Sequence, residues 1–164
     1  MPDSKVTVEA VFAKGGTVVE QPLFSDVSKN DYFHDAVEWA VDKGITSGTG
    51  ANTFSPNASC TRGQMVTILY RMEGKPSVEG LENVFTDVAD GKFYTDAVIW
   101  AASKGIVEGN GDGTFNPNGA ITREQLATIL YRYDGKQAVT EDALAGFPDG
   151  KSVSPFAVEA MNWA

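Results

Sequence analysis

Apolar residues recur at helical spacing in two short segments of the chain, separated by a polar stretch. In residues 32–43 they fall on one face of a helix, at Phe33, Ala36, Val37, Ala40 and Val41. A second stripe follows Thr61 and consists of Met65, Ile68, Leu69 and Met72. Residues 45–59 between them are rich in Gly, Asn, Ser and Pro, which is typical of an extended, turn-filled loop. The pattern therefore predicts a helix, a loop and a second helix.

The ends of these two helices carry start and stop signals. Gly44 follows the first helix at the position where a left-handed C-terminal cap places glycine. Thr61 is followed three residues later by Gln64, a capping box in which hydroxyl and amide each bind an unpaired backbone N–H. Residues 6–12 differ, because apolar and polar side chains mostly alternate there and a glycine pair then marks a turn. We expect a short β segment in that part of the chain.

The helix-loop-helix pattern occurs twice. Residues 24–71 align with residues 85–132 at a constant offset of 61 and without a gap. Identical pairs include Phe24/Phe85, Asp26/Asp87, Trp39/Trp100, Gly44/Gly105, Gly48/Gly109, Thr61/Thr122, Arg62/Arg123 and Arg71/Arg132. A third copy begins at Phe147 and reaches Trp163, so we expect it to lack its second helix. Neither pair of helices can bury its apolar stripe alone, and the repeats are therefore expected to pack against one another.

These patterns divide the chain into four parts. They are a β-strand tail of a preceding domain or linker at residues 1–22, a first repeat at 23–74, a second repeat at 84–135, and a truncated third repeat at 146–164. The expected fold class is mainly α, with tandem helix-loop-helix repeats preceded by a short β segment.

Composition narrows the choice of partners. The 164 residues include 22 acidic and 13 basic side chains, which gives a net charge of -9, and there is no basic run. Since phosphate binding relies on clustered Lys and Arg, we expect neither nucleic acid nor an anionic membrane as a partner. A hydrophobic fraction of 42% with 21% charged residues is that of a soluble globular chain without membrane insertion. An anionic ligand would have to be held by a few local cations.

Five short motifs resemble those of the S-layer homology domain family. They are Phe-x-Asp-Val, Ala-Val-x-Trp-Ala, Lys-Gly-Ile, Phe-x-Pro and the Thr-Arg helix start, and each occurs twice in full. The resemblance covers about residues 24–164. The family's recurring signature is Ile-Thr-Arg-Ala-Glu, of which this chain keeps Thr-Arg in both copies and has Gln64 or Gln125 in the last position. This glutamine still completes the capping box.

The resemblance implies both a fold and a function. Three such units form a pseudo-threefold helical bundle with projecting prongs, and secondary cell-wall polysaccharide, often carrying pyruvate ketals, binds in grooves between neighbouring units. The chain is then expected to be a non-catalytic module, without cofactor or metal, that anchors a secreted protein non-covalently to the bacterial cell wall. Its expected location is the cell surface or S-layer. A truncated third repeat would leave at least one groove incomplete, and self-association of chains could complete it.

The expected glycan contacts follow from the chemistry of a pyruvate ketal, which presents a carboxylate on a sugar ring. Arg62 and Arg123 open capped helices, where N–H groups and the helix dipole favour an anion and a guanidinium can bind a carboxylate through two N–H groups. A ring face and close access to backbone could come from Trp39, Trp100, Trp163, Gly48 and Gly109. Plainer alternatives stay open, namely solvated or ion-paired arginines and tryptophans of the core. Asp26, Asp87 and Asp149 are expected to cap the turns that enter the first helices.

An enzyme is a disfavoured alternative. The single histidine, His34, has no Cys, Ser or Asp at a recognisable nucleophile spacing. The acidic residues lie in repeated helix-surface positions, and tandem copies rarely build one active site.

A calcium-dependent adhesion module is a second alternative. Residues 110–114 resemble the start of a calcium loop, but the twelfth position is Ile121 rather than a bidentate glutamate. A glycine-rich turn explains the segment better, with weak calcium binding left open.

A protein–protein interaction or assembly module of a surface protein, with no glycan binding, is the third alternative, since helical repeats commonly bind proteins. Binding to purified wall glycan, and its loss when pyruvate is removed, separates this function from wall anchoring.

Overall fold

The computed structural model describes residues 23–164, so the β segment expected in residues 1–22 lies outside the described part. Five α-helices occur in residues 23–164: α1 (His34–Asp42), α2 (Arg62–Met72), α3 (Thr95–Ser103), α4 (Arg123–Tyr133) and α5 (Val158–Trp163). Three short 3₁₀ turns precede α5: η1 (Ala143–Gly146), η2 (Gly150–Ser152) and η3 (Pro155–Ala157). Apart from two isolated β-bridges, this part of the chain has no strand. The prediction of a mainly helical fold is confirmed.

The predicted start and stop signals are present in the structure. In α2 the Thr61 hydroxyl accepts a hydrogen bond from the Gln64 backbone N–H at 3.2 Å, and the Gln64 side chain accepts one from the Thr61 N–H at 2.8 Å. The same reciprocal pair opens α4. Gly44 and Gly105 follow α1 and α3 in the left-handed region, with φ of 68° and 67°. The capping boxes and the glycine caps are therefore confirmed.

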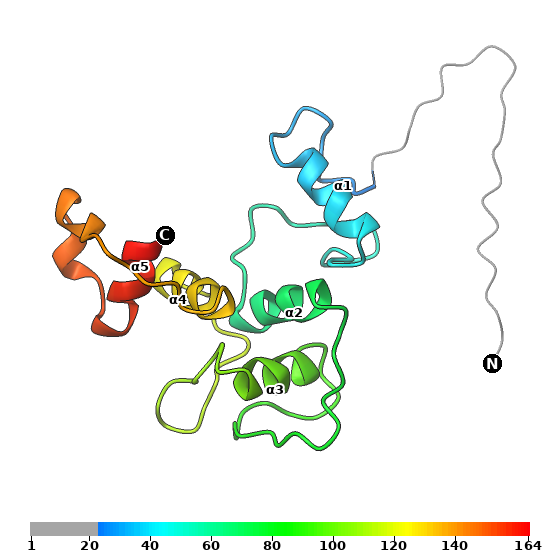
Figure 1. Cartoon of the computed structure of the whole chain (residues 1–164). Helices are drawn as coiled ribbons and strands as arrows, with labels where there is room; N and C mark the ends of the chain where they lie inside the picture. Colours follow the sequence, from blue (N-terminus) through cyan, green and yellow to red (C-terminus); the bar gives the residue numbers. More distant parts are fainter. Residues whose placement is uncertain (1–22) are drawn as a thin grey trace, which may run out of the picture.

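The helices pack across the borders between repeats rather than within them. α2 packs on α3 and α4 packs on α5, whereas neither α1 with α2 nor α3 with α4 forms a comparable pair in residues 23–164 (Figure 1). The ring centres of Tyr70 in α2 and Trp100 in α3 lie 5.7 Å apart, and those of Tyr131 in α4 and Trp163 in α5 lie 5.9 Å apart. Each packed pair therefore joins the second helix of one repeat to the first helix that follows.

Three groups of buried apolar side chains correspond to this arrangement. The largest surrounds the α2–α3 pair and includes Val66, Leu69, Val98, Trp100 and Phe115. A second lies between α4 and α5 and includes Ala127, Tyr131 and Ala160. The third holds α1 against its own loops through Phe24, Val27 and Val37. α1 is thus anchored mainly by the loops of its own repeat.

The expectation that Asp26 and Asp87 cap the turns into the first helices is wrong. The Asp26 carboxylate accepts hydrogen bonds from the backbone N–H groups of Phe54 and Ser55, at 2.8 and 2.7 Å. Asp87 does the same one repeat later, and the turn before α1 is bound by Asp31 instead. The hydrogen bond from the Phe54 N–H is the main cause that lowers the pKa of Asp26 below its usual value. These aspartates stabilise the Phe-x-Pro loop of their own repeat. The local sequence pattern could not indicate this, because the loop lies 28 and 29 residues further along the chain.

Candidate functional site

Two grooves lie at equivalent places along the chain, each between one repeat and the segment that follows. The first groove, of about 550 Å³, is lined by the loop after α1, by one face of α2, and by Phe93 from the turn before α3. The second groove, of about 330 Å³, is lined by the loop after α3, by one face of α4, and by Phe156 from the turn before α5. Each groove is therefore completed by a residue of the next unit.

Most lining positions of the two grooves correspond at the repeat offset. The corresponding pairs are Ile45/Ile106, Thr46/Val107, Ser47/Glu108, Gly48/Gly109, Thr49/Asn110, Gln64/Gln125, Thr67/Thr128, Ile68/Ile129 and Arg71/Arg132. Gln64, Ile68 and Arg71 share one face of α2 because they are spaced by four and three residues. The grooves are thus two versions of one site, built from the same helix face.

Arg71 and Arg132 are the groove arginines, and the sequence analysis did not single them out. The Arg71 Nη1 group donates to the Ile45 carbonyl at 3.1 Å. Arg132 Nη2 donates to Glu108 Oε2 at 2.7 Å, which makes an ion pair at the mouth of the second groove. Two features of the sequence could have indicated them. Both repeats have arginine at this position, and it follows the capping glutamine at helical spacing.

Arg62 lies at the border between the first and second repeats, where it is 6% exposed. Its Nε donates to the Phe115 carbonyl at 2.7 Å, and its guanidinium carbon lies 4.6 Å from the centre of the Phe115 ring. Burial lowers the pKa of this guanidinium, and the charge of Asp87 opposes that effect. Arg62 also lines the second groove, but its side-chain hydrogen bond is made to the backbone of the protein itself.

The start of α2 is also covered by the second repeat. The backbone N–H groups of Arg62 and Gly63 donate to the carbonyls of Gly119 and Pro117, at 2.9 and 2.8 Å. Two of the N–H groups that the sequence analysis assigned to an anion are therefore engaged by the protein itself. The equivalent residue at the start of α4, Arg123, is exposed.

The three tryptophans differ in burial. Trp100 is 4% exposed and belongs to the core around α2 and α3, so its ring faces are covered by protein. Trp163 is half-buried against Tyr131, while Trp39 on α1 is 54% exposed. The aromatic side chains that reach the grooves are instead Phe93 and Phe156, which are 61% and 56% exposed.

Gly48 and Gly109 line the two grooves in the left-handed backbone region, with φ of 78° and 74°. A Cβ atom on Gly48 would lie 2.6 Å from Cε1 of the Phe24 ring, and Gly109 faces the Phe85 ring in the same way. The packing of the protein thus accounts for these glycines, and the same bare backbone forms part of each groove wall.

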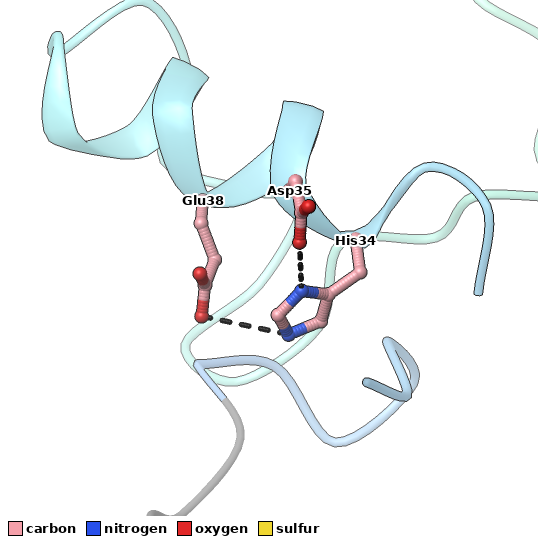
Figure 2. Close-up of side chains that lie close together, drawn as sticks. All are labelled: His34, Asp35 and Glu38. Atoms are coloured by element: carbon pink, nitrogen blue, oxygen red, sulfur yellow. Dashed lines mark hydrogen bonds and ion pairs between the residues drawn. The ribbon is translucent and has the colours of Figure 1, made fainter. Parts of the chain in front are cut away.

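His34, Asp35 and Glu38 form the one cluster of three potential metal ligands in residues 23–164. Figure 2 shows that the two carboxylates contact different ring nitrogens, Asp35 at Nδ1 with 2.9 Å and Glu38 at Nε2 with 3.5 Å. A metal ion bound to one ring nitrogen would have one of these carboxylates on the wrong side of the ring. The cluster is therefore explained as a polar contact on the surface of α1.

The glycine-rich turn that resembles a calcium loop is organised by its own hydrogen bonds. Asp112 Oδ1 accepts from the hydroxyl and the backbone N–H of Thr114, at 2.6 and 2.9 Å. The hydroxyl contact is the main cause that lowers the pKa of Asp112. The Asp112 carboxylate therefore stabilises the turn through its hydrogen bonds to Thr114.

Repeated helix pairs with a groove at each border define a modular helical repeat protein with more than one similar groove. The family model of the S-layer homology domain matches residues 23–66 and 84–127, and the chain belongs to this family. The S-layer homology domain is a non-catalytic module of surface anchoring, in agreement with the expected location at the bacterial cell surface.

Relatives include two kinds of protein. An S-layer protein of Bacillus thuringiensis subsp. finitimus is 28% identical over 143 residues, which are 85% of this chain and 16% of the relative. An endoglucanase of Bacillus sp. (strain KSM-635) is 34% identical over 147 residues, 86% of this chain and 15% of the relative. A surface-layer 125 kDa protein of Lysinibacillus sphaericus is 30% identical over 115 residues, 66% of this chain and 10% of the relative. The chain thus spans a small part of the curated relatives it matches.

Among the helices of residues 23–164, none combines the length and the apolar character that crossing a membrane requires.

Proposed function

We propose that this chain anchors a secreted surface protein non-covalently to the bacterial cell wall by binding a secondary wall polysaccharide that carries pyruvate ketals. The observation that carries the proposal is the repetition of one groove at two repeat borders, each with an arginine, a glutamine, a glycine turn and an exposed phenylalanine. Repeated grooves suit a polymer, because neighbouring sites can contact successive units of the same strand, charged or neutral, and gain in avidity.

A carboxylate on a sugar ring matches the chemistry of the groove walls. Arg71 and Arg132 each carry a planar guanidinium whose N–H groups can hold a carboxylate. Phe93 and Phe156 present a ring face to the C–H groups of a sugar. The net charge of -9 disfavours an anion at long range, but exposed charges beyond about 8 Å are screened at physiological salt. The local field of a groove therefore depends on its own lining charges rather than on distant acidic residues.

The relatives support a task that is separate from the rest of the protein. A similar segment makes up 16% of an S-layer protein and 15% of an endoglucanase. An S-layer protein and an endoglucanase can both require attachment to the cell surface, whereas they do not share a catalytic activity. The protein to which this segment belongs would then be secreted and displayed on the envelope.

Calorimetric titration of purified wall polysaccharide into the chain tests the proposal. We expect affinity to fall about ten-fold or more when pyruvate is removed from the polysaccharide by mild acid. An Arg71→Ala/Arg132→Ala variant should lose affinity to a similar extent. The matched control is Lys43→Ala/Lys104→Ala, which removes two equivalent cations that do not line either groove and should leave affinity unchanged.

Either of two outcomes would contradict this function. A folded chain that binds neither form of the polysaccharide would favour a protein–protein module, and equal binding of both forms would remove the pyruvate from the interaction. Arg123 and Trp39 are further proposed contacts, because both are exposed, and single alanine variants test them in the same titration.

A further inference from the structure

We propose that the two grooves are unequal, and that the first groove is the site that binds the carboxylate of the glycan while the second is held closed to anions by Glu108. This inference rests on the proposed function, and it assigns different tasks to two sites that the repeat makes equivalent in position. The difference arises at one lining position, which is Ser47 in the first groove and Glu108 in the second.

The second groove already contains an anion opposite its arginine. Glu108 Oε2 accepts from Arg132 Nη2 at 2.7 Å, and the two side chains are 64% and 18% exposed. An incoming carboxylate must displace Glu108 from Arg132 and remain beside it, which costs both the existing ion pair and the repulsion between two like charges. Arg62 also lines the second groove, but it is 6% exposed, so little of its guanidinium can be reached by an incoming carboxylate.

The first groove has no acidic residue among its lining side chains, and Arg71 is its one charged lining residue in the described part of the chain. The contact of Arg71 is with a backbone carbonyl, that of Ile45, so its positive charge is not neutralised by a carboxylate there. A guanidinium has five N–H groups in a planar fork, and one bond to a carbonyl leaves several of them to bind a carboxylate.

The walls of the first groove are also better suited to a sugar. Thr46 and Ser47 carry hydroxyls where the second groove has Val107 and Glu108, and sugar hydroxyls can exchange hydrogen bonds with them. The first groove is larger, at about 550 Å³ against about 330 Å³. Lys75 adds a cation nearby, because it borders with Arg71 a shallow hollow next to the first groove.

Reciprocal exchange of the two residues tests the inference. The probe is a methyl hexopyranoside carrying a pyruvate ketal, with its carboxylate methyl ester as the neutral control, titrated calorimetrically into the full chain. We expect the unchanged chain to bind about one equivalent, and Ser47→Glu to weaken binding about ten-fold or more. Glu108→Ser is expected to add a second equivalent of binding. Neither change should affect the weak binding of the ester.

Both substituted positions are exposed, so the variants should fold, and circular dichroism confirms this before titration. If Ser47→Glu were unfolded, Arg71→Gln against Arg132→Gln would make the same comparison, with loss expected for the first alone. Two equivalents bound by the unchanged chain, or loss in Arg132→Gln alone, would overturn the inference and leave the proposed function standing. Failure of the unchanged chain to bind wall polysaccharide in the earlier titration would instead overturn the proposed function, and the inference with it.

Discussion

Arg62 illustrates how one residue can be given two different tasks by its surroundings. As the first residue of a capped helix it was expected to offer its charge to a ligand, but the second repeat approaches so closely that the guanidinium is buried on Phe115. Arg123 occupies the same position in α4 and remains exposed. The Thr-Arg start thus serves the joining of repeats at the first copy and is free for contact with other molecules at the second.

Replacement of Arg62 by alanine should therefore destabilise the fold. The change leaves the buried Phe115 carbonyl without its donor and removes the contact with the ring, so the free energy of unfolding should fall by about 2–3 kcal/mol. Urea denaturation followed by circular dichroism measures this. Arg123→Ala is the matched control and should change stability by less than about 0.5 kcal/mol. Equal losses in the two variants would show that Arg62 has no special role at the border.

At the scale of the element, left-handed glycines end helices and shape loops for different reasons. Gly44 follows α1 with φ of 68° and open space around a Cβ position. Gly48 has a similar φ of 78° but faces the Phe24 ring, which is part of the core beneath α1. Alanine at either position is strained by its backbone, and at Gly48 it also collides with a buried side chain.

These two glycines predict a graded loss of stability. Gly44→Ala should lower the free energy of unfolding by about 1 kcal/mol, from backbone strain alone. Gly48→Ala should lower it by about 2–4 kcal/mol, because both the Thr53 carbonyl and the Phe24 ring must shift in a packed region. Thermal and urea unfolding of both variants give the comparison, and a Gly48→Ala variant as stable as Gly44→Ala would mean that the ring moves without cost.

The helices and their ends could be predicted from sequence because they depend on neighbours within one turn of helix. The Thr61–Gln64 pair and Gly44 are of this kind. Asp26 could not be assigned, because its partners lie 28 and 29 residues further along the chain. Trp39 and Trp100 have nearly the same local sequence, yet one is exposed and the other buried, since α2 packs on α3 and the described residues place no comparable helix on α1. The positions of Arg71 and Arg132 in the grooves were missed because they depend on loops that lie more than 20 residues earlier in the chain.

For the whole molecule, the packed unit is shifted by half a period from the repeated sequence. Residues 75–83 lie between the first and second sequence repeats, yet they join α2 and α3, the two helices of one packed pair. The loop between α1 and α2, drawn inside a repeat, joins two separately packed parts. Fragments cut at the sequence borders should therefore fold less well than fragments cut around a packed pair.

Two fragments of equal length test this shift. Residues 58–120 contain α2, α3 and the loop that binds Arg62, whereas residues 73–135 contain α3 and α4, which do not form a pair. We expect the first fragment to keep more helical circular dichroism and to unfold cooperatively, because it retains the packing of α2 on α3 and the bond from Arg62 to Phe115. A second fragment of equal helicity and cooperativity would show that packing within a repeat is sufficient.

The half-period shift also bears on how such a chain can change its number of copies. Recombination between two copies at matching positions joins the first part of one copy to the second part of another. The second helix of a repeat then still packs on the first helix of the unit that follows it. The Tyr70–Trp100 and Tyr131–Trp163 contacts are two instances of that packing. Ser47 and Glu108 take no part in these ring contacts and line the grooves instead. A chain can therefore gain copies while the helix contacts between repeats are kept. The residues that line each new groove can then change independently of those contacts.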